Sequence, residues 1–172
     1  MTPAKIETLP ELLAHALAIE HEAADRYREL ADQMEMHHNT EVAELFRKLE
    51  AIESKHVGKV ETLAEGVELP RLAAWEYQWP EGESSEGPDV HDVHYLMTPY
   101  QALELALAGE EKAATFFRDI STHDVPPEVR DAAARLADEE DEHVGLIKEW
   151  LSRYPKPDDG WDEDPDPPNQ PE

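Results

Sequence analysis

The sequence predicts an all-α protein, a four-helix bundle built from two related helical hairpins that a long crossover joins. Apolar residues recur at helical spacing in four segments. The motif Glu-x-x-His occurs in the second and fourth of them, as Glu53-Ser54-Lys55-His56 and Glu140-Asp141-Glu142-His143. The first and third segments also match each other, since the run 16–20 and the run 106–110 both end in Glu. One repeat after about 90 residues indicates a duplicated hairpin rather than a solenoid.

The first hairpin is expected to contain two long helices. The first begins at Thr8, where Thr8-x-x-Glu11 matches a capping box and Pro10 is tolerated in the first turn. The second runs from about Thr40 to Leu63. The apolar residues expected to face inward are Leu9, Leu12, Leu13, Ala16, Leu17, Ala24, Tyr27, Leu30 and Met34, followed by Val42, Leu45, Phe46, Leu49, Ile52, Val60 and Leu63.

A crossover of about 30 residues, 66–98, is long enough to run the length of a bundle. It includes a turn-rich stretch at 80–88. It also contains several aromatic residues, so we expect it to be partly buried, with Trp75 and Trp79 packed against the core.

The second hairpin starts at Thr98-Pro99-Tyr100-Gln101, a capping box with proline in the first helical position. Its first helix continues to about Ser121. Pro126 and Pro127 open the last helix, which is expected to end near Tyr154 because Pro155 follows. Its inward residues are expected to be Val129, Ala132, Ala133, Leu136, Ile147, Trp150 and Leu151.

Residues 1–155 are therefore expected to form one domain, and residues 156–172 a disordered tail. This tail is acidic and rich in proline, with too little apolar surface to order itself. Trp161 is the one residue of the tail that could dock it onto the domain or a partner.

Composition excludes several classes of function. The chain has 41 Asp and Glu against 15 Lys and Arg, a formal charge of −26, which argues against a nucleic-acid partner. It has no apolar run long enough for a membrane span and no signal-peptide pattern, so a cytoplasmic location is expected. With no cysteine, the chain itself can hold no iron–sulfur or rubredoxin-type centre.

The two motifs and the two single glutamates form the candidate metal site. Residues three apart on a helix share a face, so each motif directs a carboxylate and an imidazole to one region. Glu20 and Glu110 interrupt apolar stripes, where an unpartnered carboxylate is costly. Four carboxylates gathered in a bundle would repel one another, and two divalent cations would neutralise them. Oxygen and imidazole ligands without sulfur suit first-row divalent metals.

The order Glu20, Glu53-x-x-His56, Glu110, Glu140-x-x-His143 resembles the ferritin-like superfamily, and most closely its rubrerythrin branch. The resemblance covers roughly residues 8–154. It implies two iron ions, or manganese, with Glu20 and Glu110 as terminal ligands and Glu53 and Glu140 as bridging carboxylates. His56 and His143 would be the imidazole ligands. Tyr27, which returns to nearly the face of Glu20, would bond a ligand carboxylate or relay an electron.

Two departures from the rubrerythrin pattern stand out. Rubrerythrins carry an additional Glu three residues after the ligand of the third helix, where this chain has Ala113. They also carry a cysteine-ligated rubredoxin domain, so the rubredoxin-lacking erythrins are the better match. Phe117, which aligns with Tyr27, has no hydroxyl group.

The remaining polar residues are interpreted as non-ligands. Glu50 precedes Glu53 by one turn, but its counterpart is Ala137, which favours a solvated or supporting role. His91-Asp92-Val93-His94 reads as a polar loop rather than a second metal site. The same holds for His15, His21, His37 and His38.

The resemblance implies a di-iron oxidoreductase that reduces hydrogen peroxide or dioxygen, with electrons from Fe(II) or an external donor. A ferroxidase or iron-storage protein is the alternative, and a non-catalytic metal-binding bundle is a third reading. A homodimer or larger homo-oligomer is expected, with the bundle closed in one chain or by exchange of helices between two.

Overall fold

The computed structural model describes residues 5–80 and 93–164. Its elements are α1 (Leu9–Met36), α2 (Thr40–Leu63), the short 3₁₀ helix η1 (Ala74–Glu76), α3 (Pro99–Thr122) and α4 (Pro127–Leu151). No strand occurs in these residues. The predicted all-α four-helix bundle is therefore confirmed, and no helix in the described part of the chain is long and apolar enough to cross a membrane.

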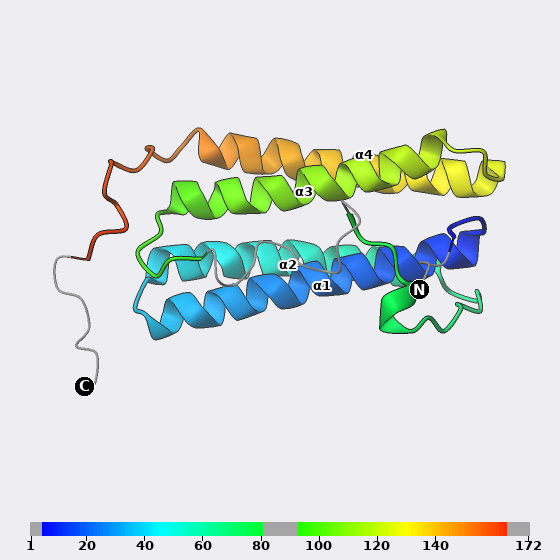
Figure 1. Cartoon of the computed structure of the whole chain (residues 1–172), viewed down its shortest axis with the longest axis horizontal. Coiled ribbons are helices and arrows are strands. Elements are labelled where there is room, and N and C mark those ends of the chain that lie inside the picture. Colours follow the sequence, from blue (N-terminus) through cyan, green and yellow to red (C-terminus); the bar gives the residue numbers. More distant parts are fainter. Residues whose placement is uncertain (1–4, 81–92, 165–172) are drawn as a thin grey trace.

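The bundle consists of two hairpins laid side by side (Figure 1). α1 packs against α2 along its length, and α3 packs against α4 in the same way, whereas contacts between the hairpins are far fewer. These fewer contacts join α2 to α3 and α1 to α4. Side chains projecting between the hairpins therefore decide how the two halves hold together.

Local chemistry at the helix starts follows the predicted caps with one exception. The Thr98 side chain accepts from the Gln101 backbone N–H, and the Gln101 side chain accepts from the Thr98 N–H, which completes a capping box. At α1, Thr8 Oγ1 accepts from the Glu11 N–H at 3.3 Å. The Glu11 carboxylate, however, accepts from the N–H of Glu7 rather than that of Thr8, so the predicted reciprocal box at Thr8 is wrong.

The end of α4 also differs from the prediction. The helix stops at Leu151, and the residues after it form a turn in which the N–H groups of Arg153 and Tyr154 bond carbonyls three residues back. Pro155 explains the difference, because a proline disfavours the helical conformation of the residue before it and the last turn tightens.

Two apolar clusters fill the bundle at opposite ends. The first gathers the end of α1, the start of α2 and the start of α3 around Phe46. The second gathers the start of α1 and the facing parts of α3 and α4 around Phe117. Both phenylalanines are fully buried. The middle of the bundle, between the clusters, is where the polar side chains lie.

Two residues expected in the core are exposed. Leu63 is 48% exposed because it is the last residue of α2, where the chain leaves the bundle and turns back at Gly66, whose φ is 73°. Trp75 is 61% exposed on η1, an element with no buried residue. Trp79, by contrast, packs against the cluster around Phe117 as expected.

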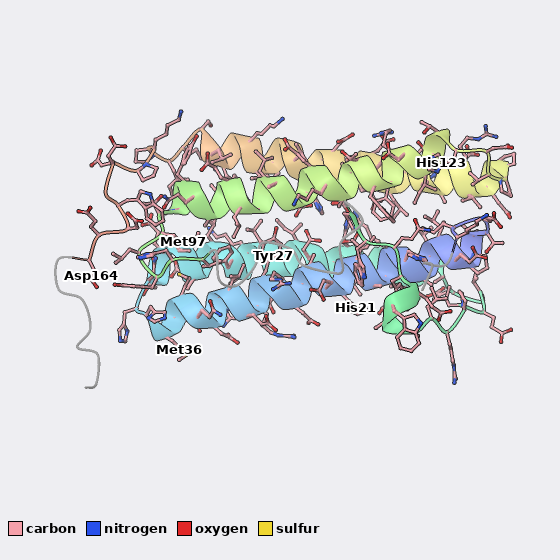
Figure 2. All side chains as sticks on the ribbon, viewed as in Figure 1. His21, Tyr27, Met36, Met97, His123 and Asp164 are labelled. Carbon is pink, nitrogen blue, oxygen red and sulfur yellow. The ribbon has the colours of Figure 1, made fainter. Side chains whose placement is uncertain are left out.

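The start of the expected tail lies against the bundle. Trp161 packs on the cluster around Phe46 and meets the His94 ring edge-on at 5.5 Å. The Tyr95 hydroxyl donates to Asp164 at 2.6 Å, and Figure 2 shows Asp164 at the same end of the bundle as Met97. The Trp161 ring therefore provides the apolar surface by which this acidic segment packs on the bundle. Residues 165–172 of the expected tail, and 81–92 of the crossover with His91 and Asp92, lie outside the described residues.

Candidate metal site

Six side chains converge in the middle of the bundle, one carboxylate each from α1 and α3, and a carboxylate and an imidazole each from α2 and α4. They are the residues predicted from sequence, Glu20, Glu53, His56, Glu110, Glu140 and His143. The four glutamates and His56 are at most 5% exposed, and the His143 side chain is 14% exposed. The helical periodicity that buries apolar neighbours buries these groups as well.

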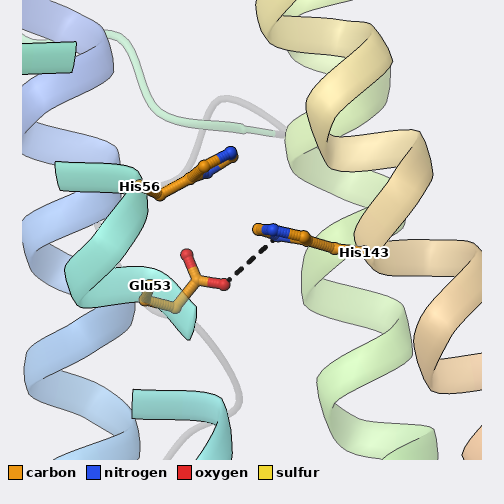
Figure 3. Close-up of side chains that lie close together, drawn as sticks. All are labelled: Glu53, His56 and His143. Carbon is orange, nitrogen blue, oxygen red and sulfur yellow. Dashed lines mark ion pairs between the residues drawn. The ribbon is translucent and has the colours of Figure 1, made fainter. Parts of the chain in front are cut away.

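The two imidazoles face each other across the gap between the hairpins, with ring centroids 4.3 Å apart. Nδ1 of His56 lies 3.1 Å from Glu20 and 3.4 Å from Glu140. Nδ1 of His143 lies 3.4 Å from Glu110. It also lies 3.5 Å from Glu53, and Figure 3 shows this ion pair. Each imidazole therefore contacts the single glutamate of its own hairpin and a motif glutamate of the other.

The donor atoms form three overlapping groups, in each of which all atoms lie within 4.8 Å of one another. These groups are Glu20–His56–Glu140, Glu110–Glu140–His143 and Glu53–His56–His143. Glu140, His56 and His143 each belong to two groups, and Glu53 lies near both imidazoles. The overlap of the groups is compatible with the predicted pair of metal ions.

Burial raises the pKa values of three of the four glutamates in the site. Burial, together with the charge of Glu53, raises the pKa of Glu20 well above its usual range. Burial does the same to the pKa of Glu140, with Glu20 adding to the shift, and it raises the pKa of Glu53. These groups therefore favour their protonated forms unless cations neutralise them.

The Glu110–His143 pair behaves in the opposite way. Burial acts against the charged form of Glu110, but the hydrogen bonds with His143, Glu140 and Glu53 and the charge of His143 together outweigh it and lower the pKa of Glu110. Burial likewise opposes the charge on His143, yet Glu110 and Glu53 raise its pKa to about 10. In the metal-free protein, the protonated His143 therefore supplies a positive charge beside Glu110 and Glu53.

Unsatisfied atoms provide the test of whether the site suits metal ions. Oε1 of Glu20, Glu53 and Glu140, and both ring nitrogens of His56, are buried without a hydrogen-bond partner. Buried polar atoms are normally paired. Three carboxylate oxygens and an imidazole nitrogen directed into one region are the donors that divalent first-row metals use. The residues present therefore fit a pair of such ions, and the assignment as ligands remains a prediction.

Tyr27 lies where the sequence placed it, beside a carboxylate of the site. Its hydroxyl donates to Glu110 Oε1 at 3.3 Å, and Figure 2 shows it in the middle of the bundle. Burial, with Glu110 and Glu53 nearby, raises the pKa of Tyr27 well above its usual value. The phenol thus stays protonated and donates its proton to Glu110.

Sequence reasoning missed one carboxylate. Glu139, on α4, places Oε2 3.0 Å from Nε2 of His56, while its side chain is 33% exposed. It precedes the motif residue Glu140 and has no acidic counterpart in the first hairpin, so neither the motif nor the repeat could indicate it. The sequence shows only that Glu139 aligns with an apolar residue, Ile52, in the first hairpin.

The other polar candidates lie away from the site or support it from outside. Glu50 accepts from Arg47 at 3.2 Å, in agreement with a supporting, solvated role. The His94 ring packs between Tyr95 and Trp161. His15, interpreted only as a non-ligand, is fully buried, with its Nδ1 2.7 Å from the Glu11 carbonyl oxygen and its ring against Tyr77.

Fold and site together define a ferritin-like bundle with a carboxylate–histidine centre. The family model for rubrerythrin matches residues 11–82. A solved structure, an uncharacterized conserved protein from Magnetospirillum magnetotacticum MS-1, is 40% identical in sequence. The match covers 88% of this chain and 98% of that one, with a TM-score of 0.68. No curated protein matches the chain. The chain belongs to the rubrerythrin family of ferritin-like proteins.

Proposed function

We propose that the protein is a non-haem di-iron oxidoreductase that reduces hydrogen peroxide, or dioxygen, with electrons from Fe(II) or an external donor. The observation that carries this proposal is the convergence of four buried carboxylates and two imidazoles, several of whose donor atoms have no hydrogen-bond partner. Glu20 and His56 would hold one ion, and Glu110 and His143 the other. Glu53 and Glu140 would lie between them.

Two ferrous ions held by these residues would supply two electrons, the number needed to reduce hydrogen peroxide to water. The chain supplies the rest. Tyr27 orients Glu110 through its hydroxyl. The apolar clusters on both sides keep bulk water away from the site.

Electrons for repeated turnover would have to come from another molecule. The chain contains no cysteine, so it holds neither a thiolate-ligated iron nor a disulfide that could store them. A separate electron-transfer protein, or Fe(II) itself, is therefore part of the proposal.

Ferroxidase activity is the second candidate, with Fe(II) as the substrate. Ala113 favours it, because the position where rubrerythrins supply a further carboxylate holds a methyl group that is 8% exposed. The set of donors then stays at four carboxylates and two imidazoles in both oxidation states. Such a site would oxidise iron and pass it on.

The deciding experiment is anaerobic loading with Fe(II), followed by stopped-flow absorbance after addition of hydrogen peroxide or dioxygen. Oxidation of about two irons per chain, faster with peroxide, would support the reductase. Faster oxidation with dioxygen and continued iron uptake, in a large closed assembly, would support the ferroxidase.

The Glu53→Ala/Glu140→Ala double variant is the control, because it removes the two carboxylates that lie between the metal positions. It should neither retain two irons nor oxidise them rapidly. If wild type and variant oxidise iron at the same slow rate, both enzymatic functions are excluded and a non-catalytic metal-binding bundle remains.

A further inference from the structure

The two halves of the site are related by the internal repeat but are not chemically equivalent. Glu20 corresponds to Glu110, and His56 corresponds to His143. The residues directly before the two motifs, however, do not match. The residue before the motif is Ile52 in the first hairpin and Glu139 in the second. Both are partly buried, so the difference lies in their chemistry rather than in their place in the fold.

His56 is contacted on both ring nitrogens. Its Nδ1 faces Glu20 at 3.1 Å and Glu140 at 3.4 Å, toward the other ligands. Its Nε2 lies 3.0 Å from Glu139 on the far side of the ring. That contact is within ion-pair distance but not aligned as a hydrogen bond, and the partly exposed Glu139 carboxylate can reorient to align it.

His143 is contacted on one ring nitrogen. In the described part of the chain, all its carboxylate contacts are made by Nδ1, to Glu53, Glu110 and Glu140. The position equivalent to Glu139 holds Ile52, which cannot accept a proton from an imidazole.

We propose that Glu139 is a positioning residue for His56, which makes the Glu20–His56 metal position depend on a carboxylate that the Glu110–His143 position lacks. A carboxylate beside Nε2 holds the proton on that nitrogen. It thereby fixes the tautomer that leaves the Nδ1 lone pair free for a metal, and it increases the basicity of the ligand. The two positions then bind metal with different affinities, although their ligands are the same.

This inference rests on the proposed metal site, and binding measurements test it without any turnover. Metal-free protein is titrated with Co²⁺ by calorimetry and visible absorbance, in wild type, Glu139→Gln and His56→Ala. Wild type should bind two Co²⁺ per chain in two separable steps. Glu139→Gln should weaken one step by about 10- to 100-fold, and His56→Ala should weaken that same step.

Glu142→Gln is the matched control. Glu142 is an exposed acid on the same helix, three residues further on, and its replacement removes the same charge. It should leave both steps within about threefold of wild type, since an exposed charge is screened by solvent and salt. Thermal unfolding of the metal-free variants shows whether each is folded.

Proton NMR of the Co²⁺ form provides a readout that a merely structural role would not change. The exchangeable Nε2 proton of His56 should be shifted by the metal, exchange slowly with water in wild type and exchange faster in Glu139→Gln. The corresponding proton of His143 should behave alike in both proteins.

Ile52→Glu tests the same idea by addition. A carboxylate at this position should strengthen Co²⁺ binding at the weaker position, Glu110–His143. It would accept a proton from His143 as Glu139 would from His56.

The proposed metal site and the role of Glu139 fail in different ways. If wild type binds no Co²⁺, the metal site is wrong and this inference falls with it. If wild type binds two Co²⁺, but Glu139→Gln binds both with unchanged affinities and unchanged proton exchange, the site stands and the role of Glu139 is overturned.

Discussion

Tyr27 shows how one hydroxyl group distinguishes two related positions. It donates to Glu110, whereas the aligned residue, Phe117, has no donor to offer Glu20. Oε1 of Glu20 has no hydrogen-bond partner in the described part of the chain. The asymmetry could be predicted from the sequence, because the repeat aligns the two positions and only one of them holds tyrosine.

Tyr27→Phe should lower the free energy of unfolding of the metal-free protein by about 1–3 kcal/mol, because a buried carboxylate oxygen loses its donor. Urea denaturation followed by circular dichroism measures this change. Tyr95→Phe is the matched control, since its hydroxyl also donates to a carboxylate, but at a partly buried position. The control should cost no more than about 0.5 kcal/mol. Equal losses in the two variants would contradict this role for Tyr27.

His15 gives a pH dependence that is separate from the metal site. Burial lowers its pKa below 6.5, although the carbonyl and carboxylate of Glu11 oppose the shift. As pH falls below 6.5, the unfolded chain binds a proton on this imidazole before the folded protein does. The stability associated with neutral His15 is therefore complete above that pH and is lost toward the lower folded value.

His15→Asn keeps a donor near the position of Nδ1 and cannot titrate. Wild type should therefore lose stability relative to His15→Asn when the pH is lowered from 7.5 to 5.5. Paired urea denaturation curves of the metal-free proteins at both pH values measure the difference. A difference that stays constant between the two pH values would show that His15 does not contribute to the pH dependence.

At the scale of elements, Asn39 joins the first hairpin to the end of the crossover. Its Oδ1 accepts from the Val42 N–H at the start of α2. Its Nδ2 donates to the carbonyls of Tyr95 and Met97 at 3.1 and 2.9 Å. One side chain therefore caps a helix and anchors the segment that leads into α3.

Asn39→Ala should lower the free energy of unfolding by about 2–3 kcal/mol, because the cap and both carbonyl bonds are lost. Asn39→Ser retains a capping oxygen and should recover about 1 kcal/mol of that loss. Thermal or urea unfolding of the three proteins separates the two contributions. Should the serine variant match wild type, the bonds to the crossover would contribute no stability.

The sequence predicted the helices because their limits are set by local chemistry. Proline, threonine caps and apolar periodicity act within a few residues, so the starts at Thr98 and Pro127 could be placed closely. The exposure of Trp75 and the docking of Trp161 could not be predicted in this way, because composition does not show which surface an irregular segment contacts. Glu139 was missed for a related reason. Its contact with His56 joins α4 to α2 and exists only after the hairpins pack.

For the whole molecule, the contacts between the hairpins are sparse, so the proposed metal ions would add to the apolar clusters in joining them. Removing metal should leave the buried carboxylates opposed across that interface and lower the stability. Mn²⁺ at about 100 times its dissociation constant should restore about 2.7 kcal/mol per site. Thermal unfolding with and without chelator measures this change at pH 7.

Glu53→Gln/Glu140→Gln is the informative comparison for the whole molecule. It removes two buried charges, so its metal-free form should be at least as stable as metal-free wild type. The gain on adding Mn²⁺ should nevertheless disappear. A variant that is still stabilised by Mn²⁺ to the same extent would show that the ions act elsewhere.

The two apolar clusters also determine how a small oxidant would travel. Phe46 and Phe117 close the bundle at both ends, so passage along its axis is blocked by fully buried side chains. The least buried groups around the centre are Glu139 and His143, both on α4, at 33% and 14% exposure. We therefore expect a small molecule to approach the centre from the flank of α4, past the Glu139 carboxylate. Size and charge would then select the incoming molecule before any chemistry begins.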